Sequence, residues 1–200
     1  PCILIGTQML AKGHDFKHIT SVFVLDTDAE LFHPDFKSQE RLGQLLTQVA
    51  GRGGRGISSS EIFLQTYYPN HPLLEKLTNG NYKEFLQEIG KEREITSMPP
   101  FSFVTLIRAN SVNEKNVVDF LDLVKKMVER VEPQSPQNQY LGPIPSMLEK
   151  RAGRYRYNFQ IKTHTRSKMH ILLTKLIEQL SKTKSFSNVR WSIDVDPIEL

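Results

Sequence analysis

Two short apolar runs near the start of the chain have the pattern of buried parallel strands. They occupy residues 2–5 and 22–25, and a turn-forming residue follows each of them. Apolar residues then recur at helical spacing over about residues 36–49, and a third strand is predicted over 61–67. Residues 1–70 therefore have the order strand, loop, strand, helix, strand, which fits the end of an α/β lobe.

The next segment, residues 71–100, has a helical pattern interrupted by turns. Leucines at helical spacing begin it, a turn at Gly80 ends this first stripe, and a second stripe covers residues 82–89. The Pro99-Pro100 pair then breaks the pattern, because proline resists helix continuation. We predict a domain boundary here; the alternative is an ordinary loop within one domain.

The remaining residues, 101–200, alternate strand and helix patterns in the order β-α-β-β-α-β. Strands are predicted over 103–109, 140–143, 154–162 and 189–195, and helices over 114–131 and 166–181. This order is that of a small two-layer sandwich of the ferredoxin-like type. The predicted fold class is thus α/β, with domains at 1–70 and 101–200 and a helical linker at 71–100.

Composition is that of an ordinary globular protein. The chain has 200 residues, a formal net charge of +4 and a single cysteine, which excludes an internal disulfide and a cysteine-based zinc site. No apolar stretch approaches the length of a membrane span and no signal peptide is visible, so no membrane association is expected. The chain begins with Pro-Cys rather than Met, and we interpret it as a piece of a longer protein. No metal site is predicted, and Asp26 and Asp28 are interpreted as carboxylates that cap a strand end.

Two segments carry candidate phosphate chemistry. Residues 48–55 (QVAGRGGR) place Arg52 and Arg55 in a glycine-rich turn after a helix. Arginine binds phosphate through a planar fork of donors that stays charged, and glycine permits close backbone approach. Residues 6–16 (GTQMLAKGHDF) lie between the two apolar runs, at the strand end where open α/β sheets bind ligands. A basic surface loop would explain either segment alone, so their combination carries the argument.

Together these segments resemble motifs V and VI of superfamily 2 helicases, in the same order and at a similar separation. The resemblance is closer to one family, the PriA replication-restart helicases (primosomal protein N′), and extends over essentially the whole chain. Further matches are Leu25-Asp26-Thr27-Asp28, Gln65-Thr66, His71-Pro72-Leu73-Leu74, Pro99-Pro100 and Asp194-Val195-Asp196-Pro197-Ile198-Glu199. The resemblance implies that residues 1–70 are the C-terminal portion of a RecA-like helicase lobe.

The resemblance also implies roles for the motif residues. Arg52 and Arg55 match the arginines that stabilise the transferred phosphoryl group of ATP. The residues that match nucleotide-side positions are Gln48, Gly13 and Asp15, and those on the DNA side are Thr7 and Gln8.

In this family a full-length protein is an ATP-dependent 3′–5′ DNA helicase that recognises stalled or branched replication forks and assembles the primosome. It uses ATP and Mg²⁺, and it holds Zn²⁺ in a part that this chain does not match. The chain contains neither a G-x-x-x-x-G-K-[ST] segment nor a D-E-x-H segment. We therefore expect the chain alone to bind no cofactor and to be inactive as an ATPase. The resemblance implies a bacterial cytoplasmic, nucleoid-associated location.

A basic stretch between residues 150 and 175 contains eight Lys or Arg and no acidic residue. Aromatic residues interleave with its first part, a composition that suits a nucleic-acid backbone and stacked bases. The candidate DNA-binding residues are Lys150, Arg151, Arg154 and Arg156. The alternative is a solvated basic face whose aromatics alternate into the core.

Arg166 and His170 lie one helical turn apart at the start of a predicted helix. The resemblance implies that this domain helps to dock the acidic C-terminal tail of single-stranded DNA-binding protein, and an arginine suits a carboxylate-ended peptide. The partners expected are branched and single-stranded DNA, that tail and other primosome proteins. Two alternatives remain at this point: a non-enzymatic DNA- or protein-binding module, and another superfamily 2 helicase such as a RecG-type branch-migration enzyme.

Overall fold

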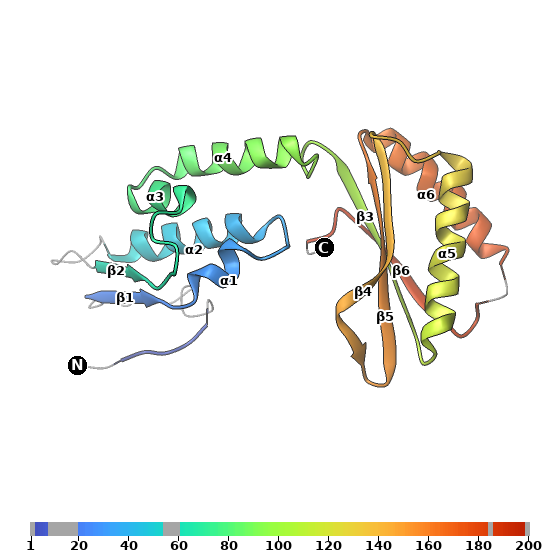
Figure 1. Ribbon diagram of the computed structural model, residues 1–200, viewed down its shortest axis with the longest axis horizontal. Helices are drawn as coiled ribbons and strands as arrows, with labels where there is room; N and C mark the ends of the chain where they lie inside the picture. Colours follow the sequence, from blue (N-terminus) through green and yellow to red (C-terminus); the bar gives the residue numbers. More distant parts are fainter. Residues whose placement is uncertain (1–2, 8–19, 54–60, 184–185, 199–200) are drawn as a thin grey trace. The chain divides into compact units, whose positions relative to one another are not determined.

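The computed structural model describes residues 3–7, 20–53, 61–183 and 186–198. The chain divides into two compact units, Pro1–Glu92 and Arg93–Leu200. Each unit has its own layer of helices against a sheet (Figure 1).

The first unit pairs two short parallel strands and covers one face of them with helices. Strand β1 (Ser21–Val24) runs parallel to β2 (Glu61–Leu64), with Val22 opposite Ile62 and Phe23 opposite Phe63. The helices are α1 (Thr27–Leu31), α2 (Ser38–Gly53), α3 (Pro72–Thr78) and α4 (Tyr82–Ile95).

Apolar residues from all four helices form the core of this unit. The buried members are Leu31, Leu42, Leu46, Leu73, Leu74, Phe85 and Ile89, and Val24 and Leu64 of the strands pack against them. Helices α2 and α4 pack closely at Gly43. A Cβ added at this position would lie only 2.3 Å from Cε1 of Phe85 in α4. The opposite face of the two strands is exposed, and there Phe23 stacks on Phe63 with ring centroids 4.8 Å apart.

Two features of this unit differ from the sequence prediction. Helix α1 was not predicted, because five residues are too few to show a helical period. Residues 3–5 were predicted as part of a strand, yet they have no regular structure and are exposed. The carboxylate of Asp28 accepts hydrogen bonds from Thr66 Oγ1 and from the Tyr67 amide, so it binds the end of β2, as a capping carboxylate would.

The second unit is a four-stranded antiparallel sheet with two helices on one face (Figure 1). Its elements are β3 (Phe103–Ser111), α5 (Glu114–Val131), β4 (Asn138–Arg151), β5 (Arg154–Thr163), α6 (Arg166–Ser181) and β6 (Arg190–Val195). The strand order is β4-β5-β3-β6. This is the predicted β-α-β-β-α-β order in two layers.

Alternation along the strands and capping of the helices explain this architecture. The odd-numbered residues of β3 and β5 point to the helices, and those from Thr105 to Ser111 and from Tyr157 to Thr163 are buried. Asn113 and Thr165 accept hydrogen bonds from the first-turn amides of α5 and α6, which fixes where the helices begin. The buried core comprises Ile107, Val117, Phe120, Leu121, Val124, Val128, Phe159, Ile161, Leu172 and Leu176, among others.

Strand β4 is the element that the sequence pattern described least well. A short strand over 140–143 was predicted, but β4 extends from Asn138 to Arg151 and contains Pro143 and Pro145. Its pairing with β5 shifts twice, between Leu141 and Ile144 and again after Pro145. A proline is tolerated there because β4 lies at the edge of the sheet, where one side of the strand needs no partner.

Candidate nucleic-acid interface

The face of the second sheet that the helices leave uncovered carries polar and basic residues. Along β3 the residues on this face are even-numbered, and Arg108 and Asn110 follow two apolar residues. Cross-strand pairing places Asn158 and Ser192 beside Arg108, on the two neighbouring strands. One step along the sheet, Asn110 lies between Arg156 of β5 and Arg190 of β6.

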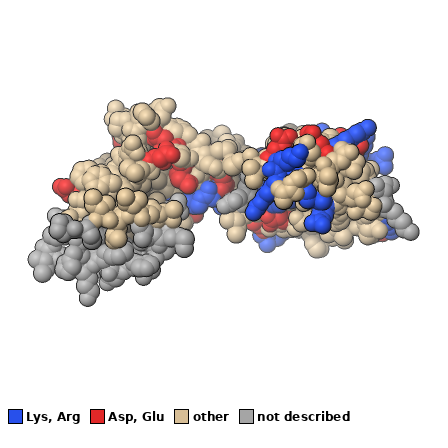
Figure 2. All heavy atoms as spheres, turned by 90° about the horizontal axis from the view of Figure 1, so that it is seen from below, with Lys and Arg blue, Asp and Glu red and all other residues tan. Residues whose placement is uncertain are grey.

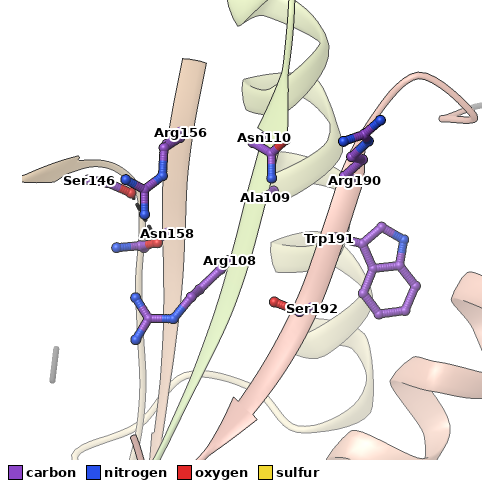
Figure 3. A pocket seen from close by; sticks show the side chains of 9 residues that line it. All are labelled: Arg108, Ala109, Asn110, Ser146, Arg156, Asn158, Arg190, Trp191 and Ser192. Carbon is purple, nitrogen blue, oxygen red and sulfur yellow. Dashed lines mark hydrogen bonds between the residues drawn. The ribbon is translucent and has the colours of Figure 1, made fainter. Parts of the chain in front are cut away.

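Four arginines from three adjacent strands therefore share one end of this face, and we call them the arginine cluster. They are Arg108, Arg154, Arg156 and Arg190. Side chains of three of these, and the residues between them, are drawn in Figure 3. Arg108 is the diagonal neighbour of both Arg156 and Arg190. Diagonal neighbours on one face of a sheet lie about 7–8 Å apart, within reach of long side chains, so these arginines concentrate positive charge. Seen in Figure 2, Lys and Arg side chains gather on this unit.

Two members of the cluster are held by neighbouring polar groups. Arg108 donates from Nε and Nη2 to one carboxylate oxygen of Asp194, at 3.3 and 3.1 Å. Arg154 donates from Nε to the side-chain oxygen of Asn110 at 2.6 Å, and from Nη2 to its carbonyl oxygen at 3.2 Å. These contacts fix the direction of both guanidiniums.

All four arginines line one or both of two hollows in the surface. A hollow of about 220 Å³ is lined by Arg108, Ala109, Asn110, Ser146, Arg156, Asn158, Arg190, Trp191 and Ser192. A second hollow of about 390 Å³ is lined by Ser111, Val112, Asn113, Asn116, Arg154, Ser187, Asn188 and Arg190. Arg190 lines both hollows, and we call the two hollows together the basic track.

The electrostatics of this track favour an anion. Neither hollow has an acidic residue in its lining. Within the described part of the chain, no carboxylate forms an ion pair with Arg156 or Arg190, whereas Arg108 has Asp194. The groups available are guanidinium, amide and hydroxyl, which are the groups that bind phosphate and sugar oxygens. The geometry is therefore suited to a polyanion.

Lys162 lies on the same face but takes a structural role. Its ammonium donates to the carbonyl oxygen of Thr96 at 3.4 Å. Burial disfavours its charged form and lowers its pKa. For these reasons we do not count Lys162 among the residues that would bind an anion on this face.

The four basic residues that the sequence predicts to bind DNA lie in two places in the structure. Arg154 and Arg156 belong to the arginine cluster. The ammonium of Lys150 lies 4.4 Å from the ring centroid of Tyr155, on the β4–β5 hairpin, and donates to its hydroxyl at 3.2 Å. Arg151 pairs with Arg154 at the end of that hairpin and is exposed.

The residues predicted to bind a partner lie on the exposed start of α6. Arg166 and His170 are both exposed, one helical turn apart. The Arg166 guanidinium donates to Asp196 at 3.2 Å and lies 5.1 Å from the ring centroid of Phe103. An exposed ion pair of this kind is worth little, so it leaves the arginine able to exchange partners.

The motif residues of the first unit are described only in part. Gln48 is exposed on α2, and the backbone of Arg52 lies in the last turn of that helix. Thr7 is described and exposed. The predicted site residues Gln8, Gly13, Asp15 and Arg55 lie outside the described residues.

Sequence reasoning missed Arg108 and Arg190. Neither belongs to a run of basic residues, so a search for charge runs passes over them. A period-two signal does exist, because Arg108 and Asn110 alternate with buried residues of β3, and Arg190, Ser192 and Asp194 alternate along β6. Strand register is what brings these residues together with Arg156.

Comparison with known proteins assigns the chain to a family. The family model described as "Primosomal protein N C-terminal domain" matches residues 94–198, more than half of the chain. The chain belongs to the PriA family. Three curated relatives, each called "Replication restart protein PriA", match nearly all of it: the Haemophilus influenzae protein at 39% identity over 99% of this chain, the Synechocystis protein at 35% over 99%, and the Bacillus subtilis protein at 34% over 98%.

These PriA proteins are considerably longer than the chain. It covers 27%, 23% and 24% of their respective lengths, and the family model places the match in the C-terminal part. Among solved structures, the de novo designed protein Foldit4 aligns with 48% of this chain and 99% of its own, at a TM-score of 0.34 and 16% identity. That likeness is too distant to support any inference.

The described residues contain neither a candidate membrane span nor a candidate metal site. No helix among them is both long and apolar enough to span a bilayer. In the same residues, no group of three or more His, Cys, Asp or Glu side chains is arranged to hold a metal ion.

Proposed function

We propose that this chain is the C-terminal part of an ATP-dependent 3′–5′ DNA helicase that recognises stalled or branched replication forks and restarts replication, and that its second unit binds the DNA backbone. Membership of the PriA family supports the first half of the proposal. The observation that carries the second half is the arginine cluster, which presents guanidiniums from β3, β5 and β6 on one open face.

DNA binding by this face would rest on phosphate contacts. Arg156 and Arg190 have guanidiniums without a carboxylate partner in the described residues, and each can meet two phosphate oxygens. Asn110 and Asn158 add neutral amide donors between them. Binding through phosphates is independent of sequence, releases counterions and weakens as salt is added.

The nucleotide half of the proposal concerns the first unit. Arg52 and Arg55 would stabilise charge on the γ-phosphate of ATP, which would be held with Mg²⁺ mainly by the rest of the longer protein. The other residues assigned to the nucleotide are Gln48, Gly13 and Asp15, and Thr7 and Gln8 would face DNA. The exposed Phe23–Phe63 stack supports the idea that residues 1–70 complete a larger RecA-like lobe, since a sheet face that apolar is normally covered.

The proposed partners follow from the same family. They are branched and single-stranded DNA, other primosome proteins, and the acidic tail of single-stranded DNA-binding protein, which would dock at Arg166 and His170. Both side chains are exposed, which supports this last assignment. Zn²⁺ would be held elsewhere in the longer protein, and the protein would act at the nucleoid in the bacterial cytoplasm.

A salt titration tests DNA binding by the arginine cluster. Labelled duplex DNA is titrated with the 200-residue chain at several salt concentrations, and the logarithm of the binding constant is plotted against the logarithm of salt. The variant Arg156→Gln/Arg190→Gln is compared with Lys126→Gln/Lys175→Gln, whose lysines are exposed on α5 and α6, the helices that cover the other face.

If each arginine neutralises one phosphate, the arginine variant should lose about 1.8 from the magnitude of the salt slope, and the lysine variant should keep the wild-type slope. The two variants carry the same charge change, so a difference between them reports position rather than net charge. Equal slopes for the two variants, or no salt-dependent binding by the wild type, would refute the proposal.

A further inference from the structure

Residues 146–149 form an irregular segment of β4, which we call the β4 bulge. The residues on either side of it, Pro145 and Lys150, pair with two β5 residues that flank a single residue, Arg156. Four residues of β4 therefore stand opposite one residue of β5. In Figure 1, β4 bows out of the sheet here, on the side away from α5 and α6. The bulge thus lies beside the arginine cluster.

The middle of the β4 bulge exposes two large apolar side chains. Met147 is 82% exposed and Leu148 is 56% exposed. Extra residues in a strand bend it and re-aim side chains, and bulges occur preferentially beside functional sites. Methionine is flexible and polarisable, so it adapts to flat and irregular surfaces. An adjacent apolar pair beside a basic face is a combination used for contact with nucleic acid.

The bulge is held at both of its ends. At the first, Ser146 Oγ donates to Oδ1 of Asn158 at 3.3 Å, inside the hollow that Arg156 lines. At the other, Lys150 donates to the Tyr155 hydroxyl at 3.2 Å, and its ammonium lies 4.4 Å from the ring centroid. A segment that is already held loses less conformational freedom when it binds a ligand.

We infer that Met147 and Leu148 contact nucleobases at an unpaired or branched step of DNA whose backbone lies on the arginine cluster. This inference rests on the proposed function and deepens it. Two kinds of complementarity select the ligand. The negative phosphates match the guanidiniums in charge, and the faces of exposed bases match the two apolar side chains next to them. In fully stacked duplex DNA the base faces are covered, so the apolar pair gains little there.

The test measures binding to two DNAs of related sequence. One is a forked duplex with unpaired bases and a 2-aminopurine at the junction, and the other is the fully paired duplex. The variant Met147→Ser/Leu148→Ser is compared with Ile171→Ser/Ile177→Ser, which removes two apolar side chains of α6 that are 53% and 48% exposed. Circular dichroism of each variant checks that the sheet is intact.

The bulge variant should bind the forked DNA about tenfold more weakly than the wild type and the duplex equally well, with unchanged salt slopes. It should also abolish the change in 2-aminopurine fluorescence that binding of the wild type causes. The α6 variant should match the wild type throughout. Equal binding of the fork by the bulge variant and the wild type would overturn the inference and leave the proposed function standing. A wild-type chain that binds neither DNA would overturn both.

Discussion

The contact between Gly43 and Phe85 gives a sharp prediction about the first unit. A methyl group at position 43 would lie 2.3 Å from Cε1 and 2.8 Å from Cζ of the phenyl ring. Carbon atoms in contact normally lie about 3.5–4.0 Å apart, so the ring would have to move by more than about 1 Å. Phe85 is fully buried, so it has no open space to move into. Overpacking of this kind costs about 1–3 kcal/mol.

A second helical glycine provides the matched control. Gly90 lies in α4, and a Cβ built there meets no atom within 4 Å. Replacing a helical glycine by alanine raises helix stability by about 0.5–1 kcal/mol through the backbone alone, and this gain applies to both positions. Gly90→Ala should therefore stabilise the unit. Gly43→Ala should leave it about 1–3 kcal/mol less stable than Gly90→Ala, which is the cost of the overlap.

Hydrogen exchange of the folded chain measures this difference locally. Amides of α2 and α4 should exchange more slowly in Gly90→Ala and faster in Gly43→Ala, while β3–β6 amides act as an internal reference. Adding Phe85→Leu to Gly43→Ala removes the ring atoms that clash, so the double variant should be more stable than the sum of the single effects indicates. Equal protection of the α2 amides from exchange in Gly43→Ala and in Gly90→Ala would contradict the close packing of Gly43 against Phe85.

Two further predictions concern the second unit. Gly142 has a φ of +131°, and a Cβ there would lie 2.8 Å from a backbone oxygen of β5, so Gly142→Ala should lower the unfolding free energy by about 1–3 kcal/mol. Gly153→Ala, with φ +74° and open space, should cost less, and urea unfolding followed by tryptophan fluorescence compares the two. Tyr157→Phe removes the hydrogen bond to the Glu114 carboxylate and should cost about 1 kcal/mol at pH 7. That bond, then burial and the Glu114 charge, raise the pKa of Tyr157 from 10.0 to about 12, so its contribution is complete below pH 10. The difference in unfolding free energy between wild type and variant should shrink as the pH rises from 10 to 12; a difference that stays constant over this window would contradict the assignment.

The helices of the second unit were predictable to the residue because several signals agree. The buried residues of α5 and α6 recur at helical spacing, and a capping side chain, Asn113 or Thr165, precedes each helix. By contrast, α1 spans only five residues, and its Asp28 contacts residues nearly forty positions later, which no local pattern contains. The length of strand β4 was underestimated because prolines normally argue against a strand. Its place at the edge of the sheet permits them.

The candidate site shows the same division between local and long-range information. Arg154 and Arg156 were found because they belong to a local run of basic residues. Arg108 and Arg190 come from strands about fifty and thirty-five residues away, and only the antiparallel register of β3 with β5 and β6 makes them neighbours. The roles of Arg52 and Arg55 came from resemblance to a family, and they remain predictions.

The prolines of β4 also affect how copies of this protein meet each other. An outer strand with free amide and carbonyl groups is a template for pairing with another chain, which leads to aggregation. Pro143 and Pro145 have no amide hydrogen, and the shifts in register interrupt the regular spacing of the groups that remain. A second extended chain therefore cannot form a continuous ladder along β4. The irregular strand can keep the face with the arginine cluster open to solvent while protecting the sheet from growth at this edge.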